Sequence, residues 1–206
     1  MKILLTEEQI NLIEATGGLD SFVNRITEKF FNDDIEGDYK EFQELLKTSI
    51  EKSGCEQIDF GVFKYPAGGV AYLTNVVINE KLLDLNMGVL IYAIFHEIGH
   101  QYQFKKYGDD VVYKIYSGEI ELPEAIQIIR KFETVADEYG LRKVKEFIKR
   151  GFVKPNDLPK AVYKNINDKQ MGSIINDMKK VVSGFEDKSR ESIALNLYNF
   201  VVSKIT

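Results

Sequence analysis

Residues 89–100 read Val-Leu-Ile-Tyr-Ala-Ile-Phe-His-Glu-Ile-Gly-His, an apolar run that ends in two histidines four positions apart. The run has the composition of a helix buried in a protein core. Asn86 suits the N-cap of this helix, Lys105 and Lys106 suit its last turn, and Gly108 suits its C-cap. We therefore predict a long buried helix between Asn86 and Gly108.

His96, Glu97 and His100 have the spacing of a metal site. Residues four apart lie on one face of a helix, so both imidazoles can bind one metal ion, with Glu97 beside them. In a zinc hydrolase the ion makes a water more acidic and polarises a carbonyl group, and the Glu accepts the proton. The chain has two histidines in total, so chance rarely produces this pattern. The competing interpretation is a pair of histidines that are merely hydrogen-bonded within the helix.

A catalytic zinc takes three protein ligands, so a third has to come from elsewhere in the chain. A longer signature continues with a glycine and a third histidine, but Gln103 and Lys106 occupy those positions here. The third ligand is therefore expected to be a carboxylate or Cys55.

Glu133 is the stronger carboxylate candidate. It lies in an apolar stripe of a helix that is predicted to start at Pro123, where an ionised side chain needs a compensating charge. Asp137, four residues later on the same face, could accept the free ring N–H of a ligating histidine. The competing interpretation places Glu133 and Asp137 on a solvated face.

The motif at 96–100, followed about thirty residues later by Glu133-x-x-Ala136-Asp137, resembles that of the gluzincin group of zinc metallopeptidases. The resemblance covers residues 71–140. It implies a zincin-like fold and hydrolysis of peptide bonds by a zinc-activated water.

Carried over residue by residue, the resemblance implies that His96, His100 and Glu133 bind zinc. It implies that Glu97 is the general base and that Asp137 is the hydrogen-bond partner of His96. The expected partner of the protein is accordingly a peptide or protein substrate.

The resemblance also implies that substrate binds along an edge strand, for which residues 71–79 are the candidate. Many such enzymes use a further histidine to stabilise the oxyanion. None remains in this chain, so a Tyr, Arg or Lys would have to replace it.

Two alternatives stay open. Cys55 lies 41 residues before His96, a spacing that resembles peptide deformylases, in which a cysteine and two histidines bind the metal. Alternatively, the metal could hold helices together in a binding or structural protein without activity. The general base Glu97 argues against the second alternative, because a structural site does not need one.

Composition excludes several other classes of function. The net charge of −5 argues against a general nucleic-acid binder, because phosphate neutralisation needs clustered basic residues. The longest apolar run, 87–95, is about half of a membrane span, so no membrane segment is expected. A single cysteine and the absence of a secretory signal favour a cytoplasmic protein.

We expect one zincin-like domain over residues 1–206, of the α+β class and mostly helical. It would comprise a helical N-terminal segment (1–55), a hairpin with the active-site and glutamate helices (56–150), and a helical C-terminal segment (151–206).

A small antiparallel sheet is predicted beside the active-site helix. Residues 57–65 alternate between apolar and polar, residues 66–69 form a turn, and residues 71–79 are rich in β-branched side chains, which together indicate a hairpin. The helix that starts at Pro123 is expected to bend or end near Gly140.

Overall fold

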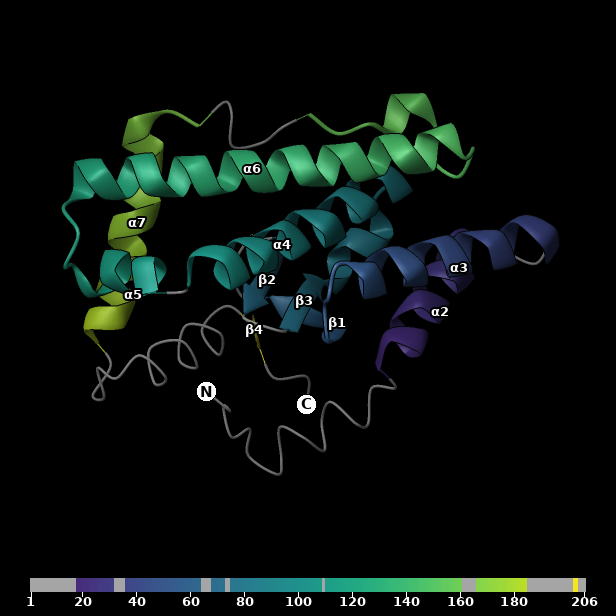
Figure 1. The fold of residues 1–206 in the computed structure, drawn as a ribbon, viewed down its shortest axis with the longest axis horizontal. Coiled ribbons are helices and arrows are strands. Elements are labelled where there is room, and N and C mark those ends of the chain that lie inside the picture. The colour runs from purple at the N-terminus through teal and green to yellow at the C-terminus, as the bar shows by residue number, and fades with distance from the viewer. Residues whose placement is uncertain are drawn as a thin grey trace.

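The structure is a computed structural model that describes residues 18–31, 36–63, 68–72, 75–108, 110–160, 166–184 and 202–203. These residues are mostly helical with a small sheet, which confirms the α+β class (Figure 1). The helices are α2 (Gly18–Phe30), α3 (Glu36–Lys52), α4 (Met87–Tyr107), α5 (Asp110–Ser117), α6 (Leu122–Lys149) and α7 (Asp168–Ser183). Two short 3₁₀ helices are η1 (Glu80–Asp84) and η2 (Pro155–Asp157). The first 17 residues of the N-terminal segment that was expected to be helical lie outside the described residues.

The sheet packs against α4 and has the strand order β2-β3-β1-β4 (Figure 1). The strands are β1 (Gln57–Phe63), β2 (Gly69–Tyr72), β3 (Asn75–Asn79) and β4 (Val202–Ser203). Strand β3 pairs antiparallel with β2 but parallel with β1, and β4 pairs antiparallel with β1. The sheet is therefore mixed, and the prediction of a purely antiparallel sheet was wrong.

The predicted hairpin between 57–65 and 71–79 is also replaced by a different pairing. Within this stretch, residues 71–72 belong to β2 and residues 75–79 to β3, and the antiparallel pair forms between these two strands. The reason lies in Val76, Val77 and Ile78, a continuous apolar run that is buried throughout. Such a run favours a central strand covered on both faces, so β3 takes the middle of the sheet and leaves β2 at its edge.

Helix α4 forms the centre of the molecule, with the sheet on one side and α6 on the other. The side chain of Asn86 accepts a hydrogen bond from the N–H of Val89 at 2.9 Å and caps the start of the helix. Gly108 ends it with a φ of 76°, a left-handed conformation that glycine adopts without strain. Both predicted ends of this helix are confirmed.

Among the described helices, none is long and apolar enough to cross a lipid bilayer.

Helices α4 and α6 approach closely because glycine lies at two points of their contact. A Cβ atom on Gly99 would lie 3.1 Å from Cα of Ala136, and one on Gly140 would lie 2.9 Å from the backbone oxygen of Tyr92. A bend or an end of the helix was expected near Gly140, but α6 continues past this glycine to Lys149, so the helix does not end there. The absent side chain of Gly140 instead makes room for α4.

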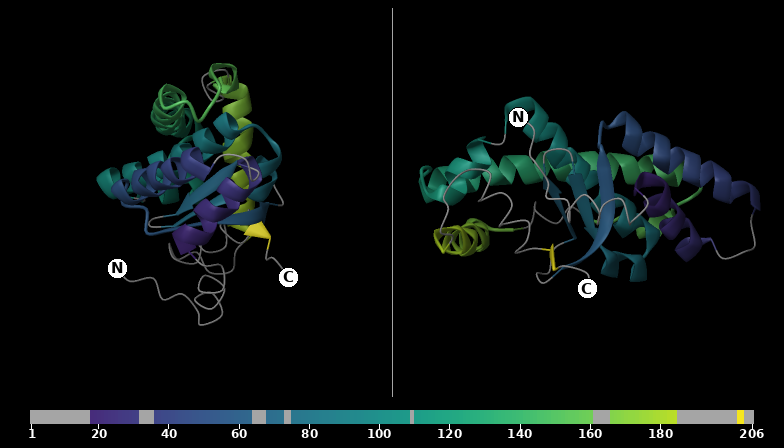
Figure 2. Two further views of the ribbon diagram at one scale, coloured as in Figure 1. Left: turned by 90° about the vertical axis from the view of Figure 1, so that its right-hand side faces the viewer. Right: turned by 90° about the horizontal axis from the view of Figure 1, so that it is seen from below.

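Two hydrophobic clusters stabilise the described part of the chain. The larger cluster joins α2, α3, the sheet, α4 and the second half of α6. The smaller one joins α5, the first half of α6 and α7, and includes Ile115, Ala125, Met171 and Ile175. Figure 2 shows α7 crossing α6 at the end that is far from α2 and α3. The middle of α6 therefore lies between the two clusters.

Candidate metal centre

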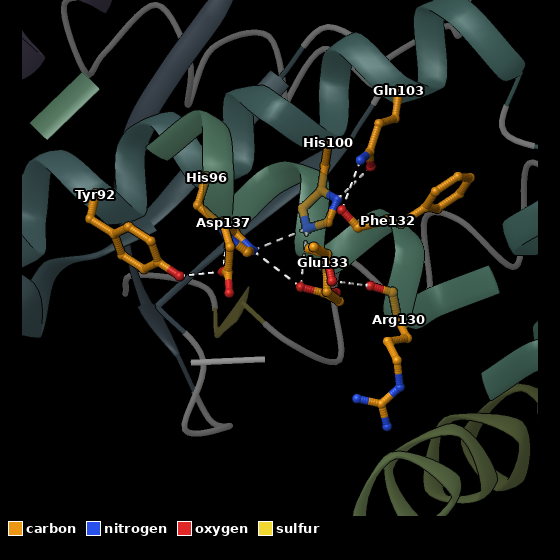
Figure 3. Close-up of polar contacts among 9 residues, drawn as sticks. Tyr92, His96, His100, Gln103, Arg130, Phe132, Glu133 and Asp137 are labelled. Atoms are coloured by element: carbon orange, nitrogen blue, oxygen red, sulfur yellow. Dashed lines mark hydrogen bonds and ion pairs between the residues drawn. The ribbon is translucent and has the colours of Figure 1, made fainter. Parts of the chain in front are cut away.

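Three side chains from α4 and α6 converge on one point (Figure 3). His96 and His100 lie one turn apart on α4, and Glu133 faces them from the middle of α6. The two Nε2 atoms are 3.1 Å apart, and Oε2 of Glu133 lies 3.2 Å from Nε2 of His96 and 3.5 Å from Nε2 of His100. The structure thus brings together the three ligands that were predicted from the sequence.

These separations fit a tetrahedral metal centre. Ligand atoms bound to zinc at about 2.0–2.1 Å in tetrahedral geometry lie about 3.3 Å from one another. Oε2 of Glu133 is buried and accepts no hydrogen bond of acceptable geometry within the described residues, although both Nε2 atoms are near. The three atoms therefore surround one position at distances that suit metal ligands. The group can hold a divalent metal ion.

The second nitrogen of His96 faces a buried carboxylate. Nδ1 of His96 lies 3.1 Å from Oδ1 of Asp137, which is 2% exposed. The hydroxyl of Tyr92 donates a hydrogen bond to the same oxygen (Figure 3). A proton on Nδ1 is favoured by this carboxylate and leaves the lone pair of Nε2 for a metal. Asp137 therefore occupies the place that was predicted for it. Tyr92 was not predicted, because it lies within an apolar run.

The second nitrogen of His100 faces Gln103. Nδ1 of His100 lies 3.0 Å from Oε1 of Gln103, and Nε2 of Gln103 donates a hydrogen bond of 2.8 Å to the backbone oxygen of Phe132. In the sequence, Gln103 stands out only because it departs from the longer signature. Its position three residues after His100, on the same helix face, is the signal that could have indicated this contact.

The charges of the cluster strongly shift its protonation equilibria. Burial disfavours the charged form of His96, but Asp137 and Glu133 outweigh burial and raise the pKa of His96 to about 10. Burial likewise opposes the charge of Glu133, but His100 and His96 outweigh it and lower the pKa of Glu133 to about 2. In the protein without metal, protons on the imidazoles thus compensate the carboxylates. A metal ion would take their place.

Glu97 lies between the metal centre and the edge strand. Its side chain is buried, and Gly69 of β2 lies directly against it. Burial raises the pKa of Glu97, whereas the charges of His96 and His100 and a hydrogen bond from the backbone N–H of Ala71 act in the opposite direction. The carboxylate is therefore held beside the candidate ligands without being one of the three.

Cys55 is not part of this cluster. Its thiol donates to the backbone oxygen of Gln57 at 3.3 Å, and burial raises its pKa to about 11. A cysteine binds metal as its thiolate, which such a pKa disfavours. The described residues thus offer Glu133, not Cys55, as the third ligand.

Tyr116 of α5 lies near the centre. It is partly buried, and burial followed by the charge of Glu133 raises its pKa to about 12. Its hydroxyl therefore keeps its proton at neutral pH and can act as a hydrogen-bond donor.

Comparisons of the chain with protein-family models, with curated proteins and with solved structures gave no significant match.

Proposed function

We propose that this protein is a zinc metallopeptidase of the gluzincin type, in which Glu97 promotes the attack of water on a peptide bond. The observation that carries the proposal is the triangle formed by Nε2 of His96, Nε2 of His100 and Oε2 of Glu133, whose sides of 3.1–3.5 Å fit tetrahedral zinc. Two imidazoles and one carboxylate are also a ligand set that catalytic zinc uses.

An arrangement of three ligands favours a catalytic over a structural centre. Structural zinc is usually enclosed by four protein ligands, whereas catalytic zinc keeps one position open, and the described residues supply three. In the open position zinc supplies an acidic water and polarises a substrate carbonyl. Glu97 is then placed to accept a proton from the attacking water and to deliver it to the leaving nitrogen. The raised pKa of Glu97 brings its carboxylate closer to the range that suits a general base at neutral pH.

Strand β2 supports a peptide as the substrate. It is an edge strand of the described sheet and lies against Glu97, whereas β3, which forms most of the predicted stretch 71–79, is central. The candidate substrate strand is therefore Gly69–Tyr72. An edge strand can bind an extended peptide through main-chain hydrogen bonds, which would place a peptide bond beside the metal centre.

Tyr116 is our candidate for the group that stabilises the oxyanion. No histidine remains for this role, and the tyrosine is close enough to Glu133 for the carboxylate to affect its pKa. A protonated hydroxyl near the ligands could donate a hydrogen bond to the negative oxygen that forms during attack.

Metal content and peptide turnover test the proposal together. We expect one zinc per chain in the wild type, Glu97→Gln and Cys55→Ser, and loss of zinc in Glu133→Ala. Turnover would be followed by mass spectrometry with a mixed peptide library, and Glu97→Gln should abolish it while keeping the metal.

Two results would contradict the proposal. Loss of zinc in Cys55→Ser but not in Glu133→Ala would favour the deformylase-like alternative. A fully loaded wild type that cleaves none of the peptides would favour a structural zinc centre.

A further inference from the structure

Gln103 connects the two helices that carry the candidate metal ligands. It lies on α4, three residues after His100, and its side chain is 2% exposed. Its Oε1 is 3.0 Å from Nδ1 of His100, and its Nε2 donates to the backbone oxygen of Phe132 on α6 (Figure 3). Phe132 directly precedes Glu133. The amide therefore bridges a ligand on one helix and the residue beside a ligand on the other.

The bridge determines which nitrogen of His100 carries a proton. The backbone oxygen of Phe132 can only accept, so the amide nitrogen of Gln103 has to face it. The amide oxygen of Gln103 then faces Nδ1 of His100, and since this oxygen also only accepts, Nδ1 has to be the donor. In the neutral ring, Nε2 is left with its lone pair directed toward the other two candidate ligands.

We infer that Gln103 is a positioning residue that holds His100 in the tautomer with Nδ1 protonated and fixes this ring relative to Glu133. The role rests on the zinc centre proposed above and deepens it. His96 is supported by the carboxylate of Asp137, whereas His100 is supported by a neutral amide from its own helix. A metal ligand held in this way loses less freedom on binding, so the bridge should strengthen metal affinity.

Gln101 provides a matched control on the same helix. It is 2% exposed, like Gln103, but its amide makes no hydrogen bond of acceptable geometry with the described residues. It lies beside the thiol of Cys55. Replacing Gln101 with Met therefore removes an equally buried amide of the same size without affecting the support of His100.

Zinc affinity, measured by competition with a chromophoric chelator, tests the inference on the full-length protein. We expect Gln103→Met to weaken zinc binding by about 10–100-fold, the usual effect of losing a partner that orients a ligand. Gln101→Met should remain close to the wild type. Circular dichroism would show whether both variants are folded. Equal affinity of folded Gln103→Met and the wild type would overturn the inference.

A second measurement on the wild type does not depend on any variant being folded. The chain has two histidines, so spectra of zinc-loaded protein labelled with ¹⁵N-histidine contain signals from two rings. We expect both rings to bind zinc through Nε2, with a proton on Nδ1 of His100 that exchanges slowly because Gln103 accepts it. Ligation through Nδ1 of His100, or fast exchange of that proton, would overturn the inference.

These outcomes separate this role from the proposed activity. A wild type that binds zinc but cleaves no peptide contradicts the peptidase alone and leaves both readouts for Gln103 in place. A wild type that binds no zinc overturns the metal centre and, with it, the role of Gln103.

Discussion

Gly69 of the edge strand lies so close to Glu97 of the central helix that a larger residue would collide with it. A Cβ atom at position 69 would be 2.6 Å from Cγ of Glu97 and 3.0 Å from the backbone oxygen of Val77. The backbone of β2 at Gly69 therefore packs directly against the side chain of the proposed general base. The position of that carboxylate depends on the absence of a side chain at Gly69.

Gly69→Ala should reduce peptide turnover by at least about tenfold, because the new methyl group would displace the carboxylate of Glu97. The rate of a catalysed reaction falls steeply when a catalytic group is moved from its position. Zinc content should be unchanged, since the ligands lie on α4 and α6. Gly68→Ala is the matched control, because its Cβ would lie 3.8 Å from its nearest neighbours, an ordinary contact. Parallel assays of zinc content and turnover would check both variants, and full turnover by Gly69→Ala would contradict this role.

Tyr92→Phe should weaken zinc binding about tenfold and lower the free energy of unfolding by about 1–3 kcal/mol. The substitution removes the hydrogen bond to the buried carboxylate of Asp137, which orients His96. The control is Tyr139→Phe on α6, because Tyr139 packs with its ring against Phe95 and its hydroxyl has no hydrogen bond to the described residues. Chelator competition and urea unfolding would test the pair; identical zinc affinities would exclude a role for Tyr92 in the metal centre.

Gly140→Ala should destabilise the protein by about 1–3 kcal/mol, because a methyl group there would press on the backbone of α4 at Tyr92 and His96. Gly172→Ala on α7 is the counterpart, since its nearest neighbour would be a flexible side-chain atom of Ile126 at 3.4 Å. Alanine is about 1 kcal/mol better than glycine within a helix, so this variant should be neutral or more stable. Thermal unfolding would distinguish the two, and equal stability would show that α4 and α6 can separate without cost.

Zinc binding should release protons and become tighter as the pH rises. The pKa of about 10 means that His96 is charged at pH 7 in the metal-free protein, and zinc has to displace that proton. The apparent affinity should therefore increase about tenfold per pH unit for each displaced proton, until the pH reaches the raised pKa that His96 has in the metal-free protein. Calorimetry in buffers of different ionisation enthalpy would count the protons. Binding without proton release would contradict the charge state of the cluster.

The sequence contained enough information to find the three candidate ligands and Asp137, but not the contacts of Tyr92 and Gln103. His96 and His100 are visible because a helix places residues four apart on one face, and Glu133 because a carboxylate in an apolar stripe needs a partner. Tyr92 on α4 contacts Asp137 on α6, and Gln103 on α4 contacts the backbone of Phe132 on α6. Such contacts depend on how two helices pack, and the pattern within one helix does not reveal them.

The strand order was missed for a related reason. Alternation at 57–65 and β-branched residues at 71–79 indicate strands, but neither pattern says which strands are neighbours. The order was decided by the burial of Val76, Val77 and Ile78 on both faces of the sheet. The expectation that the helix could end at Gly140 failed for a similar reason: glycine weakens a helix in isolation, but here the missing side chain lets the backbone of Tyr92 approach.

The position of Glu133 between the two hydrophobic clusters has a consequence for biosynthesis. Helix α6 is held at one end by α5 and α7 and at the other by the sheet-bearing core, and its middle carries the candidate third ligand. A newly made chain in which either end has not yet packed does not have this carboxylate in place opposite the imidazoles. Capture of the ion would therefore mark the completion of folding, and incompletely folded chains would stay unloaded.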